Sequence, residues 1–255
     1  IKVMDDPENE KPHKKRTCKD NVKTQNLWGI MLFPSFWCLL SMYLTFAFVL
    51  LLFGSIMLGM AMNINTYSFR YDNKCTVGDT SCSVTFTPDV ELENPKLYYE
   101  IHNFYGNHRN YVKSRDYSQL RGNTPSSVSN CDPIKKNKDV SDPLFNLNGN
   151  ELDDNDVANP CGLIAKYMFT DTFSLYNSNG TQIPIDESDI SHSVDRNSRF
   201  ERPSDYKTIQ WRDVENEHLM VWYQTDAFPN FIKLWGRIDT TLQSGTEYEI
   251  RVNNK

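Results

Sequence analysis

A run of 46 residues without a charged side chain, residues 24–69, constrains this sequence more than any other feature. Its apolar centre, residues 36–62, would measure roughly 40 Å as an α-helix, whereas the hydrocarbon core of a bilayer is roughly 30 Å thick. Because only a helix satisfies its own backbone hydrogen bonds in lipid, we predict one transmembrane helix within residues 34–62. A cleaved signal peptide is the alternative, but its apolar region is normally only about 7–15 residues long.

The charges on either side of this segment predict its orientation. Residues 11–23 contain six basic side chains and one acidic side chain, whereas residues 63–69 contain neither. Because positive charge stays on the cytosolic side, we expect residues 1–33 to be a cytosolic tail and residues 63–255 to form a lumenal or extracellular domain. The whole chain has 27 basic and 33 acidic side chains, a balance that argues against nucleic acid as a partner.

Two features of the expected lumenal part agree with that orientation. Asn179 begins the sequence Asn-Gly-Thr, which is an acceptor for N-glycosylation. Four cysteines, an even number suited to an oxidising compartment, allow three disulfide pairings, namely those among Cys75, Cys82, Cys131 and Cys161. Metal binding is the alternative for these thiols, but no two of them have the Cys-x-x-Cys spacing.

One face of the predicted membrane helix carries small and hydroxylated side chains, at Ser41, Thr45, Ser55 and Gly59. Ser55 and Gly59 are four residues apart, a spacing that lets a second helix approach closely. Two interpretations stay open. The helix is either a simple anchor facing lipid or packs through this face on the transmembrane helices of a partner.

Strand patterns dominate the remainder of the chain. Apolar and polar side chains alternate in residues 96–102 and 247–252, as in strands with one buried face, and residues 84–86 and 219–223 read similarly. The expected helices are short, at residues 107–118, 162–176 and 228–237, and residues 121–156 read as loop-rich. We therefore predict a mainly β, antiparallel, sandwich-like domain decorated by loops and short helices.

A search for catalytic motifs yields only weak candidates. The sequence has no phosphate-binding loop, no His-Glu-x-x-His zinc motif and no Gly-x-Ser-x-Gly motif. Asp154 and Asp156 have the Asp-x-Asp spacing of lumenal glycosyltransferases, which share the single-anchor topology, but a solvated acidic loop reads the same way. A surface adhesion or receptor domain is a further alternative.

Three segments carry a much more specific signal. They are YYEIHNFYGNHRNYVKSRD at residues 98–116, NPCGLIA with MFTDTF at residues 159–173, and VW with FPNFIKLWGRI at residues 221–238. In sequence and in order they closely resemble the signatures of the CDC50/LEM3 family, the non-catalytic β-subunits of P4-ATPase lipid flippases. Gly106 and Asn110 depart from the residues usual in the family.

The resemblance implies a subunit with no active site and no cofactor of its own. Such a subunit forms a heterodimer with a P4-ATPase in the bilayer, supports its folding and its exit from the endoplasmic reticulum, and supports phospholipid translocation to the cytosolic leaflet. It resides in the endoplasmic reticulum, the Golgi or the plasma membrane. The resemblance also implies a second transmembrane helix near the C-terminus, which this sequence lacks, so we expect it to be a truncated form. Which ATPase and which lipid are involved is not implied.

Individual signature residues have two interpretations. Polar residues of the first segment are partner contacts or parts of an internal network, and they are Asn107, His108, Arg109, Lys113 and Arg115. We expect packing or turn-forming roles for another set, namely Phe104, Tyr105, Pro160, Gly162 and Phe231.

Overall fold

The computed structural model describes residues 35–73, 75 and 81–253, and divides the chain into two compact units, residues 1–64 and 65–255. The first unit contains one long helix, α2, at Phe36–Met62. The Oγ atom of Ser35 accepts a hydrogen bond from the backbone N–H of Cys38, which caps the helix start. Within the unit no residue of α2 is buried, and apolar side chains occupy every face. A helix that is apolar on every face is normally buried in lipid or in protein. By its length and composition α2 is able to cross a membrane.

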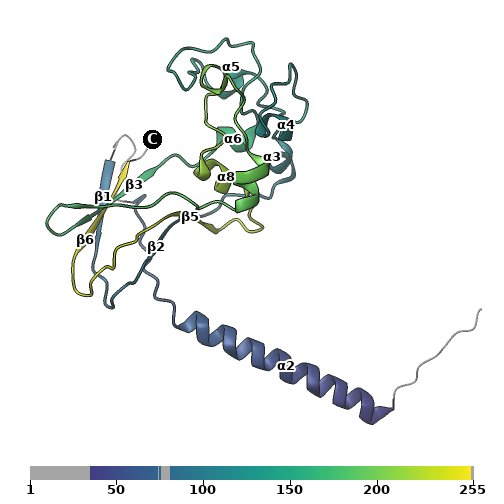
Figure 1. The fold of residues 1–255 in the computed structure, drawn as a ribbon, viewed down its shortest axis with the longest axis vertical. Helices are drawn as coiled ribbons and strands as arrows, with labels where there is room; N and C mark the ends of the chain where they lie inside the picture. Colours follow the sequence, from purple (N-terminus) through teal and green to yellow (C-terminus); the bar gives the residue numbers. More distant parts are fainter. Residues whose placement is uncertain (1–34, 74, 76–80, 254–255) are drawn as a thin grey trace, which may run out of the picture. The chain divides into compact units, whose positions relative to one another are not determined.

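The second unit contains a four-stranded antiparallel sheet with the strand order β1-β6-β3-β4 (Figure 1). The strands span Ser81–Phe86 (β1), Thr172–Asn177 (β3), Gln182–Ile183 (β4) and Tyr248–Asn253 (β6). In β6 the side chains of Tyr248, Ile250 and Val252 are buried and alternate with more exposed neighbours, as the sequence pattern predicts. With Leu175 and Leu242 they form one hydrophobic core.

A second sheet consists of β2 (Lys96–Ile101) and β5 (Phe231–Arg237), which pair antiparallel. An isolated bridge between Asp186 and Arg237 connects the end of β5 to the segment that follows β4. The buried rings of Tyr99 and Trp235 belong to a larger core, into which the short helices also pack.

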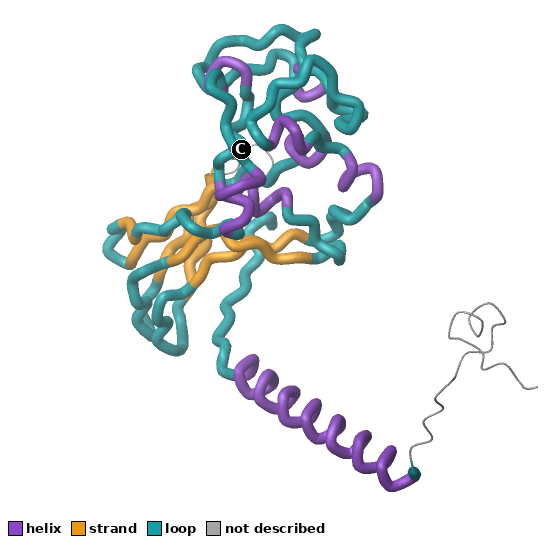
Figure 2. Tube along the Cα trace, turned by 45° about the vertical axis from the view of Figure 1, so that its right-hand side comes forward, coloured by secondary structure: helices purple, strands orange, loops and turns teal. Residues whose placement is uncertain are grey.

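Short helices and loops gather on one side of this unit and the strands on the other (Figure 2). The helices are α3 (Arg109–Lys113), α4 (Tyr117–Leu120), α5 (Asn137–Val140), α6 (Leu163–Lys166), the π-helix η1 (Asp195–Arg199), α7 (Tyr206–Ile209) and α8 (Glu217–Tyr223). A small separate core surrounds the buried sulfurs of Cys131 and Cys161. The predicted mainly β, antiparallel domain with short helices is thus confirmed.

Several predicted elements are wrong in type or extent. Residues 219–223 form part of α8 rather than a strand, because all five side chains are buried and none alternates toward solvent. Residues 231–237 form β5 rather than a helix. The helix predicted at residues 162–176 ends at Lys166, and β3 begins at Thr172. The helix predicted at residues 107–118 is interrupted between α3 and α4.

Candidate partner-binding surface

Among the described residues, no group of three or more His, Cys, Asp or Glu side chains is placed to hold a metal ion. Asp154 and Asp156, the pair expected for a glycosyltransferase, have backbone carbonyls that accept hydrogen bonds from the N–H groups of Lys138 and Asn137, at 3.3 and 3.1 Å. The acidic loop therefore packs along α5, and nothing in the geometry supports a metal site there.

The first and third signature segments lie side by side where β2 ends and β5 begins. The backbone N–H of Phe104 donates to the carbonyl oxygen of Pro229 at 3.0 Å. The Nδ2 atom of Asn107 donates to the carbonyl oxygen of Ala227 at 2.8 Å, and Asn230 Oδ1 accepts from the N–H of Asn103 at 3.0 Å. Two turns separated by more than 100 residues in the chain are thereby fixed to each other.

A glycine lets the second signature segment approach the backbone of the first closely. Gly162 has φ 101° and ψ 167°, a conformation that is essentially restricted to glycine. It begins α6, whose first N–H, that of Leu163, donates to Ser114 Oγ at 2.9 Å. The Ser114 hydroxyl in turn donates to the carbonyl oxygen of Cys131, the partner of Cys161 in a disulfide. The other disulfide joins Cys75 and Cys82.

A buried lysine joins α8 to the turn that follows it. Lys233 is only 6% exposed, and its Nζ atom donates to the carbonyl oxygens of Val221 and Gln224, at 3.0 and 2.7 Å. The Asp226 carboxylate lies 2.7 Å from the same nitrogen. Burial lowers the pKa of the Lys233 ammonium, and the Asp226 carboxylate opposes this effect. The cation therefore caps the C-terminal end of a short helix from inside the core.

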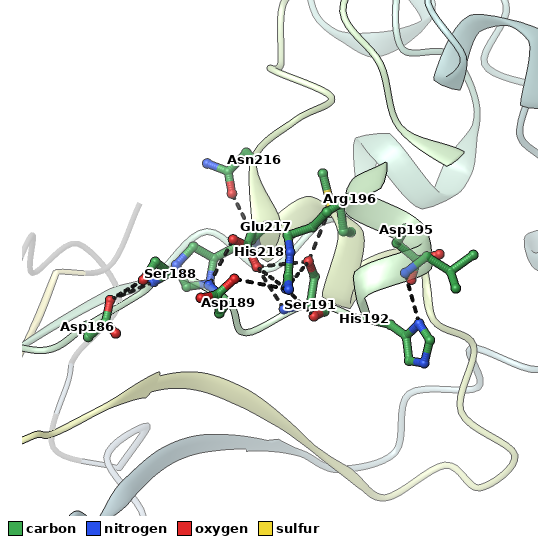
Figure 3. A network of polar contacts seen from close by, with 12 residues as sticks. Asp186, Ser188, Asp189, Ser191, His192, Asp195, Arg196, Asn216, Glu217 and His218 are labelled. Atoms are coloured by element: carbon green, nitrogen blue, oxygen red, sulfur yellow. Dashed lines mark hydrogen bonds and ion pairs between the residues drawn. The ribbon is translucent and has the colours of Figure 1, made fainter. Parts of the chain in front are cut away.

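A second polar network fastens the start of α8 to the segment before η1 (Figure 3). The Glu217 carboxylate accepts hydrogen bonds from the N–H groups of Asp189 and Ser191, both at 2.9 Å, and lies 3.2 Å from Arg196 Nη1. Burial alone would raise the pKa of Glu217, but these donors and the Arg196 charge hold its pKa below the ordinary value. The neighbouring His218 ring stacks on Trp235, with 4.0 Å between centroids.

The structure separates the expected contact residues of the first segment into two groups. Arg115 is directed inward, because its Nη1 donates to the carbonyl oxygen of Tyr223 at 3.3 Å, and the Asn107 amide is bonded to Ala227 as described above. His108, Arg109 and Lys113 are exposed on or beside α3.

The hydroxyls on the predicted face of α2 bond within their own helix. Ser41, Thr45 and Ser55 each donate to a backbone carbonyl three or four residues earlier, at 2.8–3.0 Å. A Cβ atom at Gly59 would meet nothing within 4 Å inside the unit. Both interpretations of this face therefore stand: it contacts lipid, or it packs on a neighbouring helix.

The sequence analysis did not predict the exposure of two aromatic rings in the signature segments. Packing or a turn was expected at Tyr105: its carbonyl oxygen closes a turn by accepting from the N–H of His108, but its ring is 63% exposed and does not pack in the core. The ring of Phe228 is 74% exposed. Phe104 instead fills the core, with ring centroids 5.3 Å from Tyr111 and 5.6 Å from Trp222. Residue type does favour this arrangement, because Phe is more often fully buried than Tyr, whose hydroxyl group prefers water.

The acceptor for glycosylation is accessible. Asn179 lies at the exposed turn between β3 and β4, where Asn177 Oδ1 accepts hydrogen bonds from the N–H groups of Asn179 and Thr181, at 3.1 and 2.8 Å.

Comparison with known proteins gives one consistent result. Residues 17–255 match the model of the LEM3 (ligand-effect modulator 3) family / CDC50 family. The putative ALA-interacting subunit 4 of Arabidopsis thaliana is 31% identical over 247 residues, covering 86% of this chain and 68% of that protein. ALA-interacting subunit 3 of the same plant is 28% identical over 245 residues, covering 84% and 65% respectively. Cell cycle control protein 50A of Bos taurus is 32% identical over 218 residues, covering 69% and 56%. The chain thus spans between about half and two thirds of these relatives.

Proposed function

Because the chain belongs to the LEM3/CDC50 family, we propose that it is the accessory, non-catalytic β-subunit of a P4-ATPase phospholipid flippase. In this role it forms a heterodimer with the catalytic subunit and supports that subunit's folding, its exit from the endoplasmic reticulum and its transport of phospholipid to the cytosolic leaflet. The names of the plant relatives describe them as interacting subunits, which supports an accessory role.

One observation carries this proposal: the three signature segments converge on a single part of the fold. The hydrogen bonds between Phe104 and Pro229 and between Leu163 and Ser114 join them without assembling a metal cluster among the described residues. The second segment joins the first at the buried Ser114, whereas the first and third meet at turns that are exposed. Segments so specific in sequence that end in exposed turns suit binding of another protein.

The proposed topology follows from the flanking charges. Residues 1–33 are cytosolic, residues 34–62 contain α2 and cross the bilayer, and residues 63–255 form the lumenal or extracellular domain, in the endoplasmic reticulum, Golgi or plasma membrane. In this topology Asn179 is glycosylated. Digestion with an N-glycosidase is expected to lower the apparent mass of the natural protein and to leave Asn179→Gln unchanged, with Asn155→Gln as the control. Resistance of the natural protein to digestion would argue against the orientation.

Purification tests the proposed assembly. The full-length protein, tagged and extracted in mild detergent, is expected to carry a P4-ATPase polypeptide in a one-to-one ratio. A folded protein that elutes without such a companion would refute the proposal.

A further inference from the structure

A buried hydroxyl group in α3 has no partner within the described part of the chain. It belongs to Tyr111, whose Oη atom is shielded from solvent and makes no hydrogen bond to any described residue. The neighbouring Trp222 does not supply one, because its single indole N–H donates to the carbonyl oxygen of Ile164 at 2.9 Å. Burying a hydroxyl without a hydrogen bond is costly, so a partner for this atom is expected.

The Tyr111 hydroxyl needs an acceptor rather than a donor. Burial raises the pKa of this phenol, and the Trp222 indole opposes that effect only in part. The group is therefore protonated at neutral pH, and its O–H is a hydrogen-bond donor.

A small cavity lies next to Tyr111. Polar residues of the turn that follows α8 line it together with the tyrosine, and they are Gln224, Thr225, Asp226 and Lys233. It has about 10 Å³ of space for the centre of a water molecule. About 10–15 Å³ in this measure is what one water molecule requires, so the cavity has room for one and for nothing larger.

The coincidence of an unpaired atom and a cavity is specific to Tyr111. Buried side-chain atoms without a described partner also occur at Asn137, Gln210, Arg212, His218 and Trp235. None of these five residues lines this cavity.

The charged pair at the cavity leaves an acceptor free but no donor. The three N–H groups of the Lys233 ammonium are matched by the carbonyl oxygens of Val221 and Gln224 and by Asp226 Oδ2, at 3.0, 2.7 and 2.7 Å. Asp226 Oδ1, by contrast, has no partner among the residues that the structure describes. A molecule in the cavity can therefore donate to this carboxylate.

These groups favour a neutral molecule over an ion. A cation in the cavity would lie close to the Lys233 ammonium, and an anion would lie close to the Asp226 carboxylate. A water molecule carries no charge, fits the available space, and is able to accept from a phenol and donate to a carboxylate at the same time.

We propose that one ordered water molecule occupies this cavity, where it accepts a hydrogen bond from the Tyr111 hydroxyl and donates to the Asp226 carboxylate. The water joins α3 in the first signature segment to the turn after α8 in the third. It also hydrates the ion pair of Lys233 and Asp226, which lowers the cost of removing these charges from solvent.

The sign of one stability change tests the inference in the full-length protein, held in mild detergent. Tyr111→Phe removes only the hydroxyl. If the water is bound, the variant loses a hydrogen bond, and the ratio of folded to unfolded domain should fall by about twofold to tenfold. If the hydroxyl is unpaired, the same substitution removes a destabilising group, and the ratio should rise instead.

Tyr105→Phe is the matched control, because it deletes the same atom from an exposed ring and should leave the ratio unchanged. Urea unfolding followed by tryptophan fluorescence measures all three proteins. A Tyr111→Phe variant as stable as the natural protein, or more stable, would overturn the inference.

An experimental structure of the full-length protein that resolves ordered water gives an independent check. We expect a single peak at about 2.5–3.0 Å from Tyr111 Oη and within hydrogen-bonding distance of the Asp226 carboxylate. An empty cavity, or a Tyr111 hydroxyl bonded directly to a protein acceptor, would refute the proposed site. Neither experiment depends on whether the protein binds a P4-ATPase, so their outcome is separate from that of the proposed function.

Discussion

Replacing Gly162 with alanine tests how closely two signature segments must approach each other. A Cβ atom at this position would overlap the Ser114 carbonyl oxygen and lie 2.6 Å from the Ser114 carbonyl carbon. Because both obstacles are backbone atoms, no side chain can rotate away. The φ of 101° adds about 1–3 kcal/mol of strain for a non-glycine residue. Relieving the overlap adds about 1–3 kcal/mol.

We therefore expect Gly162→Ala to lower the free energy of unfolding by about 2–6 kcal/mol, a large part of the roughly 5–15 kcal/mol typical of a domain. Gly149→Ala is the control, because Gly149 also has positive φ, at 82°, but a Cβ there meets nothing within 4 Å. It should cost only about 1–2 kcal/mol. Urea unfolding followed by tryptophan fluorescence measures both. Equal losses in the two variants would refute the close approach as the constraint.

Two further predictions concern the same domain. Replacing both Cys131 and Cys161 with alanine should destabilise it more than the same change at Cys75 and Cys82, because the sequence separations are 30 and 7 residues. From loop entropy, the Cys131–Cys161 disulfide is expected to stabilise the domain by about 3.6 kcal/mol and the Cys75–Cys82 disulfide by about 2.4 kcal/mol. A lower urea midpoint for the variant without Cys75 and Cys82 would contradict this reasoning. The substitution Glu217→Gln should make the stability of the domain less dependent on pH in the acidic range. The lowered pKa of Glu217 stabilises the fold above the unfolded-state value, about 4.3, and this contribution disappears as the pH falls through the lower folded-state pKa. Melting temperatures between pH 5 and pH 3 should therefore fall more steeply for the natural protein than for the variant, and parallel curves would exclude the carboxylate as the cause.

The elements that depend on local pattern follow directly from the sequence. The long helix follows because its 27 residues are uncharged and mostly apolar, and a helix is the only single-segment structure that satisfies its backbone in lipid. α2, at Phe36–Met62, lies within the residues 34–62 predicted for it. Strand β6 follows because Tyr248, Ile250 and Val252 alternate with polar residues, one face of the strand being buried.

The wrong predictions for β5 and Tyr105 arise where the burial of a side chain depends on contacts with distant parts of the chain. In β5 the buried positions are Phe231, Lys233, Trp235 and Gly236. A lysine among them conceals the alternation of apolar and polar residues. Its burial depends on the α8 carbonyls and on Asp226, which are distant contacts that no local pattern reveals. The exposure of Tyr105 has the same origin, because only the packed fold shows that Phe104 has already filled the core.

Lipid transport by reconstituted proteins tests the central claim most directly. Vesicles would contain the full-length protein alone, a co-purifying P4-ATPase alone, or the two together, and movement of labelled phospholipid between leaflets would be measured with ATP. We expect no transport by this protein alone, and ATP-dependent transport that is much faster with both proteins than with the ATPase alone. Transport by this polypeptide without the ATPase, or an ATPase equally stable and active in its absence, would contradict the account.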